Sequence, residues 1–187
     1  MKEFTLIFRA VYRAAEAHRY QNRKGGDTPY ITHPVAVGMI LQKYEFPETW
    51  VAAGILHDTI EDTELTLKDI RQEFGGEVAE IVDGCSEPEH KERPWRQRKT
   101  HTIEYVKTAP YPVKIVSCAD KLHNLMTSRD DLAALGESFW ERFKFGRDYQ
   151  AWYHRSLVDS FLENVAHQLQ HEIFFRYQKI VADVFDN

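Results

Sequence analysis

The sequence predicts an all-α fold, and two observations support this prediction. Apolar residues recur at spacings of three and four along most of the chain, as they do on one face of a helix. No stretch alternates apolar and polar residues convincingly, so the sequence does not require strands. We expect a bundle of about eight or nine helices, since a typical helix has roughly 11–12 residues.

The apolar spacing identifies the helical segments in chain order. It appears in residues 7–14, 35–41, 51–60, 78–82, 113–122 and, rich in aromatic residues, 139–185. Glycine and proline separate these segments at residues 25–26, 46–47, 75–76, 88–94 and 110–112. The charged, proline-bounded residues 87–98 are the least regular part, and we interpret them as a loop that carries Trp95.

Length and composition narrow the class of protein. A chain of 187 residues and 22.0 kDa fits one domain, which we take to span residues 1–187. Hydrophobic residues make up 43% and charged residues 28%, enough apolar matter for a core. No apolar run approaches the ~18 residues of a membrane span. The N-terminus also lacks the unbroken apolar stretch of roughly 7–15 residues that a secretory signal needs, so we expect a cytoplasmic protein without a membrane partner.

Charge and cysteine content exclude further classes. The formal net charge is −5 and the pI is near 6.0. Proteins that bind nucleic acid through its phosphates usually carry a basic surplus, so nucleic acid is not an expected partner. A phosphate-bearing ligand would need a local cluster of cations. Cys85 and Cys118 form no CxxC motif, which disfavours structural zinc or a disulfide framework and favours a reducing compartment.

The dipeptide His57–Asp58 is the most specific local feature. It follows an apolar run, and Glu61 and Asp62 follow four residues later. Positions i and i+4 share a helix face, so we expect His57 beside Glu61 and Asp58 beside Asp62. An isolated pair of this kind is more often a helix cap or a solvated surface patch.

Two other segments favour a metal site over a surface patch. His33 lies at a predicted helix start, with Pro34 suited to the first helical position. Asp120 lies in the apolar stretch IVSCAD, where a carboxylate is costly to bury unless it is paired or bound to a metal. Two imidazoles and two carboxylates on three helices could converge on one cation. Mixed nitrogen and oxygen donors suit Mn²⁺ or Fe²⁺, and Mg²⁺ less well.

The segments HPVAV (33–37), LHDTIEDT (56–63) and ADKLHNL (119–125) resemble the HD-domain metal phosphohydrolases. Within this group they are most similar to the hydrolase half of the RelA/SpoT alarmone enzymes and to the small alarmone hydrolases. The resemblance covers residues 5–130 and includes the lead-in NRKGGDTPYITHP and the segment FGGEVAEIVDG. It implies an HD-domain helical bundle, completed by C-terminal helices in residues 138–187.

The resemblance also implies roles for the site residues. The metal ligands would be His33, His57, Asp58 and Asp120. Glu61 and Asp62 would position and activate the attacking water; Glu61 is our choice of base, and the two roles could be exchanged. The implied cofactor is one Mn²⁺ per chain, with Fe²⁺ or Mg²⁺ as alternatives.

A second metal would need further histidines, as in some HD proteins. Only His90 and His101 lie between Asp58 and Asp120. His90 belongs to the charged loop, and His101 is more simply a polar-face residue, so a single metal is favoured. We interpret His123 as structural.

A pyrophosphate-bearing substrate needs cations to bind it. Arg23 and Lys24 could fold over the metal site from the glycine-rich lead-in, although an ordinary solvated loop is an equal alternative. Arg98 and Lys99 stand where the alarmone enzymes carry a basic pair. Asn124, one turn after the last metal aspartate, could hydrogen-bond a ribose or phosphate.

The chain departs from the family pattern in two places. After VDG the family commonly has VTKL, whereas this chain has CSEPEHKERPWRQRK. Beyond residue 131 the resemblance thins, and Arg142, Arg147, Trp152 and Tyr153 remain candidates for base stacking or phosphate contacts. An aromatic stripe at helical spacing is more often part of the core.

These observations together predict a metal-dependent phosphohydrolase. The expected reaction is removal of pyrophosphate from the 3′ position of guanosine 3′,5′-bis(diphosphate), with this small-molecule nucleotide as substrate. Alternative substrates are an adenine alarmone, NADPH or a nucleoside monophosphate. A non-catalytic nucleotide-binding regulatory module is the second class, although all six metal and catalytic residues are present. The aromatic C-terminal helices could form a homo-oligomer face or only close the core.

Overall fold

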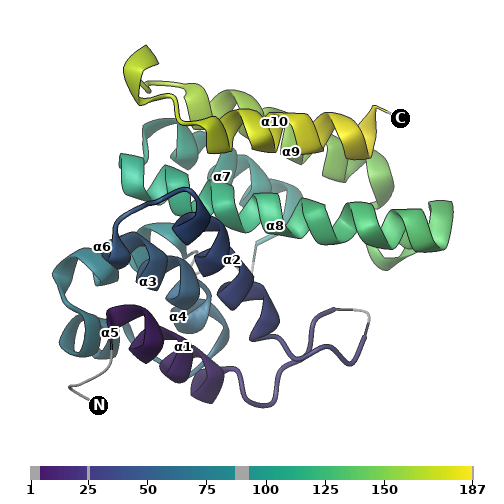
Figure 1. Ribbon diagram of the computed structural model, residues 1–187. Coiled ribbons are helices and arrows are strands. Elements are labelled where there is room, and N and C mark those ends of the chain that lie inside the picture. Colours follow the sequence, from purple (N-terminus) through teal and green to yellow (C-terminus); the bar gives the residue numbers. More distant parts are fainter. Residues whose placement is uncertain (1–4, 25, 87–92, 187) are drawn as a thin grey trace. The chain divides into compact units, whose positions relative to one another are not determined.

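The computed structural model describes residues 5–24, 26–86 and 93–186, and this part of the chain is helical (Figure 1). The α-helices are α1 (Leu6–Ala17), α2 (Thr32–Lys43), α3 (Glu48–Leu56), α4 (Thr59–Asp62), α5 (Leu67–Phe74), α6 (Gly76–Cys85), α7 (Trp95–Thr108), α8 (Tyr111–Leu135), α9 (Gly146–Leu162) and α10 (Glu172–Phe185). The 3-10 segments are η2 (Gly136–Arg142) and η3 (His167–Leu169). Nine of the α-helices in the described residues have eight residues or more, so the prediction of an all-α fold is confirmed.

The described residues divide into two compact units. The first contains helices α1 to α6 and residues Ile115–Asp120 of α8. The second contains α7, the rest of α8, α9 and α10. In the first unit α3 packs against α1, α2 and α6, and in the second α9 packs against α7 and α10. That residues 1–187 act as one domain stays a prediction.

Helices α2 and α3 approach each other closely because glycines lie at their contact. A Cβ atom on Gly54 would lie 2.4 Å from Cδ1 of Leu41, and one on Gly38 would lie 2.5 Å from Cγ1 of Ile55. Leu41 and Ile55 are themselves buried. A larger side chain at either glycine would require Leu41 or Ile55, or the helix that carries it, to shift. One predicted site histidine lies on α2 and the other directly follows α3, so this contact sets their spacing.

The helical run predicted through residue 60 is interrupted at the dipeptide His57–Asp58. Helix α3 ends at Leu56, and the single turn α4 begins at Thr59. Nδ1 of His57 lies 2.7 Å from the carbonyl oxygen of Gly54, and Oγ1 of Thr59 donates to the carbonyl of Leu56 at 2.6 Å. These side chains compete with the backbone for carbonyl groups at the end of α3, which accounts for the break.

The prediction of a loop over residues 87–98 is wrong for its last residues. Helix α7 begins at Trp95, directly after Pro94, and residues 87–92 lie outside the described part of the chain. The residues WRQR contain arginine and glutamine, which are good helix formers despite their charge and polarity. Packing adds to this preference, since the Trp95 ring centre lies 5.3 Å from that of Phe145.

A buried lysine caps the C-terminal ends of two helices in the second unit. The Lys114 ammonium donates to the carbonyl oxygens of Lys107 at 3.0 Å, Ser160 at 3.2 Å and Glu163. These carbonyls lie at the C-terminal ends of α7 and α9, where intrahelical donors are missing. All three ammonium donors are therefore used, and the charge faces the negative ends of two helix dipoles.

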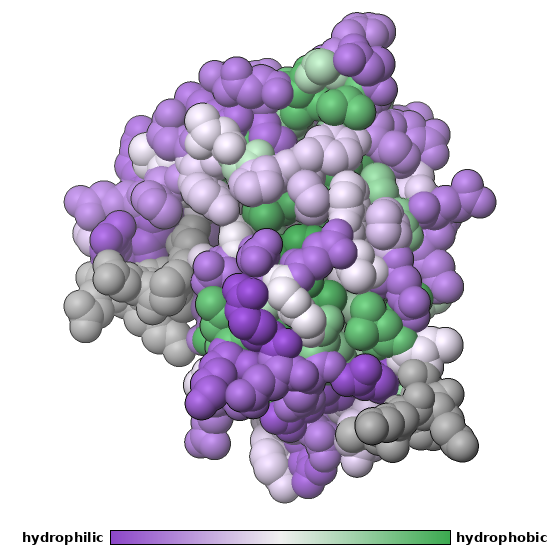
Figure 2. All heavy atoms as spheres, turned by 90° about the vertical axis from the view of Figure 1, so that its left-hand side faces the viewer, coloured by the Kyte–Doolittle hydropathy of each residue, from purple (hydrophilic) through white to green (hydrophobic). Residues whose placement is uncertain are grey.

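Hydrophilic side chains cover most of the face shown in Figure 2, and the hydrophobic areas between them are small. The apolar side chains of the described residues are instead largely inside the two units, where for example Ile55 and Tyr177 are buried. None of the helices described in the structure combines the length and the apolar character that crossing a membrane requires.

Replacing Gly54 by valine should destabilise the protein. The added methyl groups would overlap the buried Leu41 and approach Val37, and overpacking of this kind costs about 1–3 kcal/mol. Urea unfolding of Gly54→Val measures the loss. Gly26→Val is the matched control, since nothing lies within 4 Å of a Cβ atom there. Equal free energies of unfolding for the two variants would contradict the close packing of α2 and α3.

Lys114→Met should also lower the free energy of unfolding, by at least about 2 kcal/mol. Methionine keeps much of the apolar stem, and Asn164 still donates to the Lys107 carbonyl at 3.2 Å. The carbonyls of Ser160 and Glu163 lose the ammonium donor, and each buried carbonyl left without a donor costs about 1–3 kcal/mol. Lys179→Met, at an exposed position of α10, controls for loss of a lysine charge in the same unit. If thermal or urea unfolding shows the same stability for both variants, the capping role of Lys114 is refuted.

Candidate metal centre

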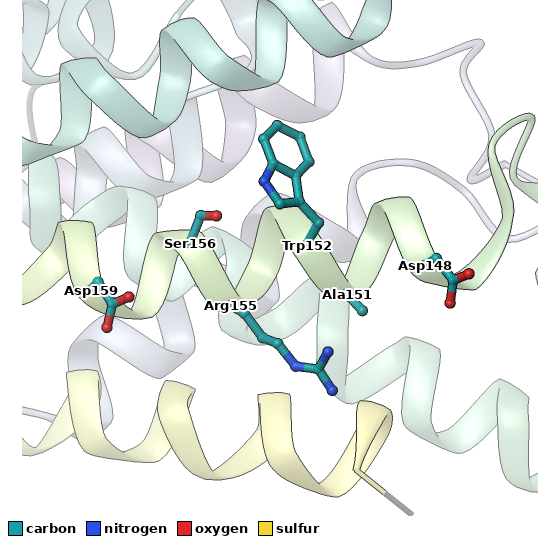
Figure 3. A pocket seen from close by; sticks show the side chains of 6 residues that line it. All are labelled: Asp148, Ala151, Trp152, Arg155, Ser156 and Asp159. Carbon is teal, nitrogen blue, oxygen red and sulfur yellow. The ribbon is translucent and has the colours of Figure 1, made fainter.

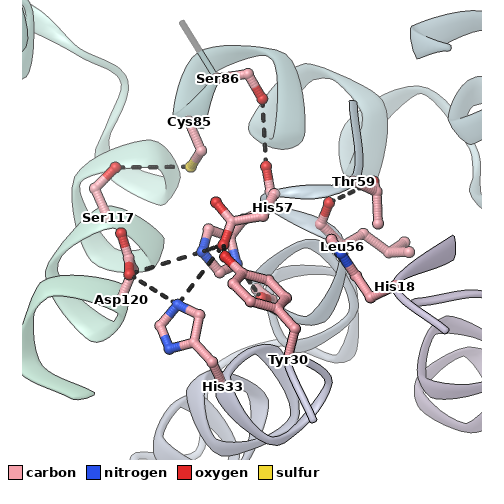
Figure 4. A network of polar contacts seen from close by, with 12 residues as sticks. His18, Tyr30, His33, Leu56, His57, Thr59, Cys85, Ser86, Ser117 and Asp120 are labelled. Atoms are coloured by element: carbon pink, nitrogen blue, oxygen red, sulfur yellow. Dashed lines mark hydrogen bonds and ion pairs between the residues drawn. The ribbon is translucent and has the colours of Figure 1, made fainter. Parts of the chain in front are cut away.

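Two histidines and two aspartates meet in the first unit. Nε2 of His33 lies 3.1 Å from Oδ1 of Asp120 and 3.7 Å from Oδ2 of Asp58. Nε2 of His57 lies 3.0 Å from Oδ2 of Asp58 and 3.7 Å from Oδ1 of Asp120. The side chains of His33, His57 and Asp120 point toward one another in Figure 4. The structure thus brings together all four residues that the sequence predicts as metal ligands.

Three separate elements supply these side chains. His33 lies in the first turn of α2, His57 and Asp58 lie between α3 and α4, and Asp120 lies on α8. His33, His57 and Asp120 are buried, with at most 6% of each residue exposed, and Asp58 is half-buried. Carboxylates at such depth are costly unless a positive charge compensates them.

The tautomer of His57 suits a metal ligand. Its Nδ1 lies 2.7 Å from the Gly54 carbonyl oxygen, which can only accept, so Nδ1 carries the proton. The buried Nε2 has no hydrogen-bond partner among the described residues, although Asp58 is close. A backbone carbonyl that fixes one ring nitrogen and leaves the other for a cation is the usual arrangement around metal-binding histidines.

The donor set fits a divalent cation. One ligand atom from each of His33, His57 and Asp58 lies within 4.8 Å of the others, and Asp120 adds a second carboxylate near both rings. Imidazole nitrogens and carboxylate oxygens directed at one another need a positive charge between them. Their mixture of nitrogen and oxygen is the donor chemistry of Mn²⁺ and Fe²⁺ sites.

The electrostatics of the group also favour a positive charge at its centre. Burial alone would lower the pKa of His57, but the charges of Asp58 and Asp120 raise it well above its usual value. Burial alone would raise the pKa of Asp58, but the charge and hydrogen bond of His57 together with the charge of His33 outweigh it, and the pKa falls below its usual value. Burial lowers the pKa of His33. The carboxylates therefore hold a positive charge, either a proton on His57 or a cation in its place.

Tyr30 contacts the group and was not predicted from the sequence. Its hydroxyl donates a hydrogen bond to Oδ2 of Asp58, and its ring meets the His33 ring edge-on at 5.9 Å. Burial, together with the charge of Asp58, raises the pKa of Tyr30, so the phenol keeps its proton and acts as a donor. The only sequence signal was its position three residues before His33, in the segment YITH.

The end of α6 lies against the same group. The Ser86 hydroxyl is 2.8 Å from the carbonyl oxygen of Val82 and 3.3 Å from that of His57, and its one proton can be donated to either. Sγ of Cys85 lies 3.6 Å from Oγ of Ser117, one turn before Asp120 on α8 (Figure 4). Neither Cys85 nor Cys118 forms a disulfide in the described part of the chain. These contacts support the chain on two sides of the metal group.

Glu61 and Asp62, the predicted catalytic pair, follow Asp58 on α4. The Asp62 amide donates to the Asp58 carbonyl at 3.0 Å, so the two are one turn apart, as the sequence predicts. Glu61 is half-buried and Asp62 is exposed. Their roles in catalysis stay predictions.

Arg23 and Lys24 precede the metal group in the first unit. The Arg23 guanidinium carbon lies 5.9 Å from the centre of the Tyr30 ring, which in turn contacts the metal group. Lys24 is exposed on the same segment. The structure therefore brings Arg23 near the predicted ligands through Tyr30.

The remaining predicted substrate contacts belong to the second unit. Arg98 and Lys99 lie on α7, and Asn124 lies on α8. Nζ of Lys99 is 4.9 Å from the centre of the Tyr153 ring, whereas Nε of Arg98 is buried without a hydrogen-bond partner in the described chain. Contact of these residues with a substrate stays a prediction.

Two of the C-terminal residues considered for substrate binding make hydrogen bonds within the protein. Nη1 of Arg142 donates to Asp131 at 2.7 Å, and Nη2 of Arg147 donates to the carbonyl of Phe185 at 3.3 Å. Tyr153 is buried, as expected for a core aromatic residue. These contacts give Arg142 and Arg147 structural roles within the second unit.

A separate hollow lies along α9 (Figure 3). Its lining consists of Asp148, Ala151, Trp152, Arg155, Ser156 and Asp159. Trp152 and Arg155 extend from the helix in different directions. The hollow contains none of the residues predicted to bind the metal or to activate water, so it is not assigned to the reaction.

The group of metal-ligating residues found in the described part of the chain includes neither of the two histidines considered for a second metal. His90 lies outside the described residues. His101 is exposed on α7, and its ring is nearly parallel to that of Tyr105 at 6.4 Å. His123 lies on α8 and is half-buried. The expectation of a single metal stays a prediction.

Comparison with known proteins identifies the family. An HD domain is matched over residues 10–139, more than half of the chain. The chain therefore belongs to the HD-domain family, and the resemblance seen in its motifs is confirmed.

Curated relatives define the branch more closely. A guanosine-3′,5′-bis(diphosphate) 3′-pyrophosphohydrolase of Danio rerio is 38% identical over 123 residues, which are 64% of this chain and 67% of that protein. An enzyme of the same name from Haemophilus influenzae is 39% identical over 61% of this chain and 17% of its own length. A GTP pyrophosphokinase of Streptomyces coelicolor is 43% identical over 66% of this chain and 15% of its own length. The chain thus matches only a small part of the two longer relatives.

Two solved structures share the fold. The crystal structure of lmo0812 from Listeria monocytogenes has a TM-score of 0.77 and 39% identity, over 83% of this chain and 99% of that one. A metazoan orthologue of SpoT, described by its title as hydrolysing ppGpp, has a TM-score of 0.77 and 26% identity, over 95% of this chain and 94% of that one.

Asp120→Ala should abolish tight Mn²⁺ binding. The substitution removes the carboxylate that lies near both imidazoles, so affinity should fall by more than the roughly 100-fold seen when only an outer partner of a ligand is lost. Isothermal titration of the protein with Mn²⁺ measures this. Asp83→Ala, at an exposed position of α6, is the control. Wild-type affinity in Asp120→Ala would remove Asp120 from the ligand set.

Proposed function

We propose that this protein is a metal-dependent phosphohydrolase that removes pyrophosphate from the 3′ position of guanosine 3′,5′-bis(diphosphate). One observation carries the proposal: the four-residue metal group occurs in a chain 38% and 39% identical to proteins named as 3′-pyrophosphohydrolases of this nucleotide. The nucleotide would be the small-molecule partner of the protein.

The cofactor in this proposal is one Mn²⁺, with Fe²⁺ or Mg²⁺ as alternatives. Its ligands would be His33, His57, Asp58 and Asp120. When bound, such a cation polarises phosphorus–oxygen bonds and lowers the pKa of a water molecule. The neutral Nε2 of His57 and the two carboxylates supply donors that hold it without further charge from the protein.

The carboxylates of α4 would move the protons. Glu61 would accept a proton from the attacking water, whose oxygen forms a bond to the phosphorus next to the 3′ oxygen. The phosphorus–oxygen bond to the ribose then breaks, and the products are pyrophosphate and a free 3′ hydroxyl. Asp62 would orient the water or protonate the leaving oxygen, and the two roles could be exchanged. The half-buried position of Glu61 favours it as the base.

Local cations would bind the diphosphate, because the chain as a whole carries a net charge of −5. Arg23 lies at cation–π distance from the ring of Tyr30, whose hydroxyl contacts the proposed metal ligand Asp58. Lys24, Arg98 and Lys99 would add positive charge, and Asn124 would hydrogen-bond the ribose or a phosphate.

A product assay tests the proposal. Purified protein with Mn²⁺ should release pyrophosphate from guanosine 3′,5′-bis(diphosphate). Glu61→Gln should lower kcat by about 10²–10⁴-fold, the usual contribution of a general base, while Mn²⁺ binding persists. Glu64→Gln, exposed two residues beyond the pair, is the matched control and should retain wild-type kcat.

The same assay separates the alternatives. An adenine analogue, NADPH and deoxynucleoside monophosphates are offered in parallel. Cleavage of one of these, but not of the guanine compound, would keep the phosphohydrolase chemistry and replace the substrate. Mn²⁺ binding without cleavage of any of them would favour a nucleotide-binding regulatory module.

A further inference from the structure

The residues before α2 form a small hairpin. The Arg23 amide donates to the Thr28 carbonyl at 2.8 Å, and the Tyr30 amide donates to the Gln21 carbonyl at 2.8 Å. An antiparallel bridge joins residues 22 and 29 between these two bonds. Arg23 and Tyr30 therefore lie on opposite strands of one hairpin, close to its base.

Two side chains fasten this hairpin to the segment that contains the metal and catalytic residues. Nε2 of Gln21 donates to the Asp62 carbonyl at 2.7 Å, and the Tyr30 hydroxyl donates to Oδ2 of Asp58. Nδ1 of His18, 2.7 Å from Oε1 of Gln21, fixes which way the Gln21 amide faces. The Gln21 contact reaches only backbone, whereas the Tyr30 contact reaches a predicted metal ligand directly.

We infer that Tyr30 is a positioning residue for the metal centre. Its hydroxyl holds the Asp58 carboxylate in the orientation in which Oδ2 faces both imidazoles, and its ring carries Arg23 beside that carboxylate. The first part rests on the metal group alone. The second part, in which Arg23 meets the substrate, rests on the proposed function.

The geometry of Asp58 explains why such a residue is needed. Oδ2 is the oxygen that lies 3.0 Å from His57 and 3.7 Å from His33, and it is also the oxygen that accepts from Tyr30. The terminal torsion of an aspartate is broad, so a free carboxylate would sample many orientations. A hydrogen bond from a neutral phenol restricts this motion without neutralising the negative charge that attracts a cation.

Tyr30 is itself held firmly. Its ring centre lies 4.7 Å from that of buried His18 and 5.9 Å from that of buried His33. Figure 4 shows the tyrosine beside His33 with its hydroxyl directed into the polar network. On the ring, the Arg23 guanidinium is at cation–π distance, 5.9 Å from the centre. A ring fixed by its neighbours is able to fix the carboxylate that it contacts.

Titration of the protein with Mn²⁺ alone tests the inference. Tyr30→Phe removes one oxygen and keeps the ring with its contacts to His18 and His33. The Mn²⁺ dissociation constant, measured by electron paramagnetic resonance, should rise by about 10–100-fold, as for loss of an outer partner of a metal ligand. Tyr20→Phe is the matched control, because Tyr20 is 92% exposed, and it should bind as the wild type does. Circular dichroism checks that both variants fold.

A second variant separates the hydroxyl from the hairpin. Gln21→Leu detaches the hairpin from Asp62 but leaves the phenol in place, so the Mn²⁺ dissociation constant should stay within about twofold of wild type. The inference is overturned if Tyr30→Phe also stays within this limit. It is equally overturned if Gln21→Leu weakens binding as much as Tyr30→Phe does, because the hairpin as a whole would then support the site.

An activity measurement distinguishes this inference from the proposed function. If the nucleotide is cleaved, excess Mn²⁺ should restore the kcat of Tyr30→Phe, which a general structural defect would prevent. If no nucleotide is cleaved, the proposed function fails, but the Mn²⁺ titration still decides the role of Tyr30.

Discussion

Helices α2 and α3 meet at Gly38 and Gly54, and the metal group depends on this contact. A side chain at either position would overlap Leu41 or Ile55 of the facing helix, so the close approach of the two helices depends on glycine at both positions. His33 lies on α2 and His57 directly follows α3, and their ring centres are consequently 5.3 Å apart. Gly54 has a second role, because its carbonyl oxygen binds Nδ1 of His57. The same residue therefore sets the spacing of the imidazoles and the tautomer of one of them.

The sequence predicts the fold class and the grouping of the site residues well, because both leave local signals. Helical spacing of apolar residues is a property of single segments, and the ligand motifs each lie within one segment. The breaks are harder to predict. The interruption at residues 57–58 arises because His57 and Thr59 bond to backbone carbonyls, and apolar periodicity carries no trace of this competition. Helix α7 begins at Trp95, before the predicted end of the loop at residue 98, because this charged, proline-bounded segment contains residues that favour helix formation.

Contacts between distant residues were the least predictable part of the site. The Tyr30 hydroxyl donates to a carboxylate 28 residues further along the chain. The segment YITH contains no signal from which this partner could be predicted. Arg147 likewise is bound to a carbonyl 38 residues away, although its sequence context suggested a phosphate contact. The residue type alone does not show whether a side chain bonds within the protein or to a ligand. The fold is needed to distinguish the two.

The two units meet the need for buried positive charge in different ways. In the second unit the ammonium of Lys114 is bonded to three helix-end carbonyls, and it is covalently part of the chain. In the first unit the carboxylates of Asp58 and Asp120 draw either a proton or the metal cation that we propose. One charge is carried by a side chain of the protein, and the other can be supplied by an ion from the medium. Changes in the supply of divalent ions will therefore act on the chemistry of the first unit and leave the helix ends of the second as they are.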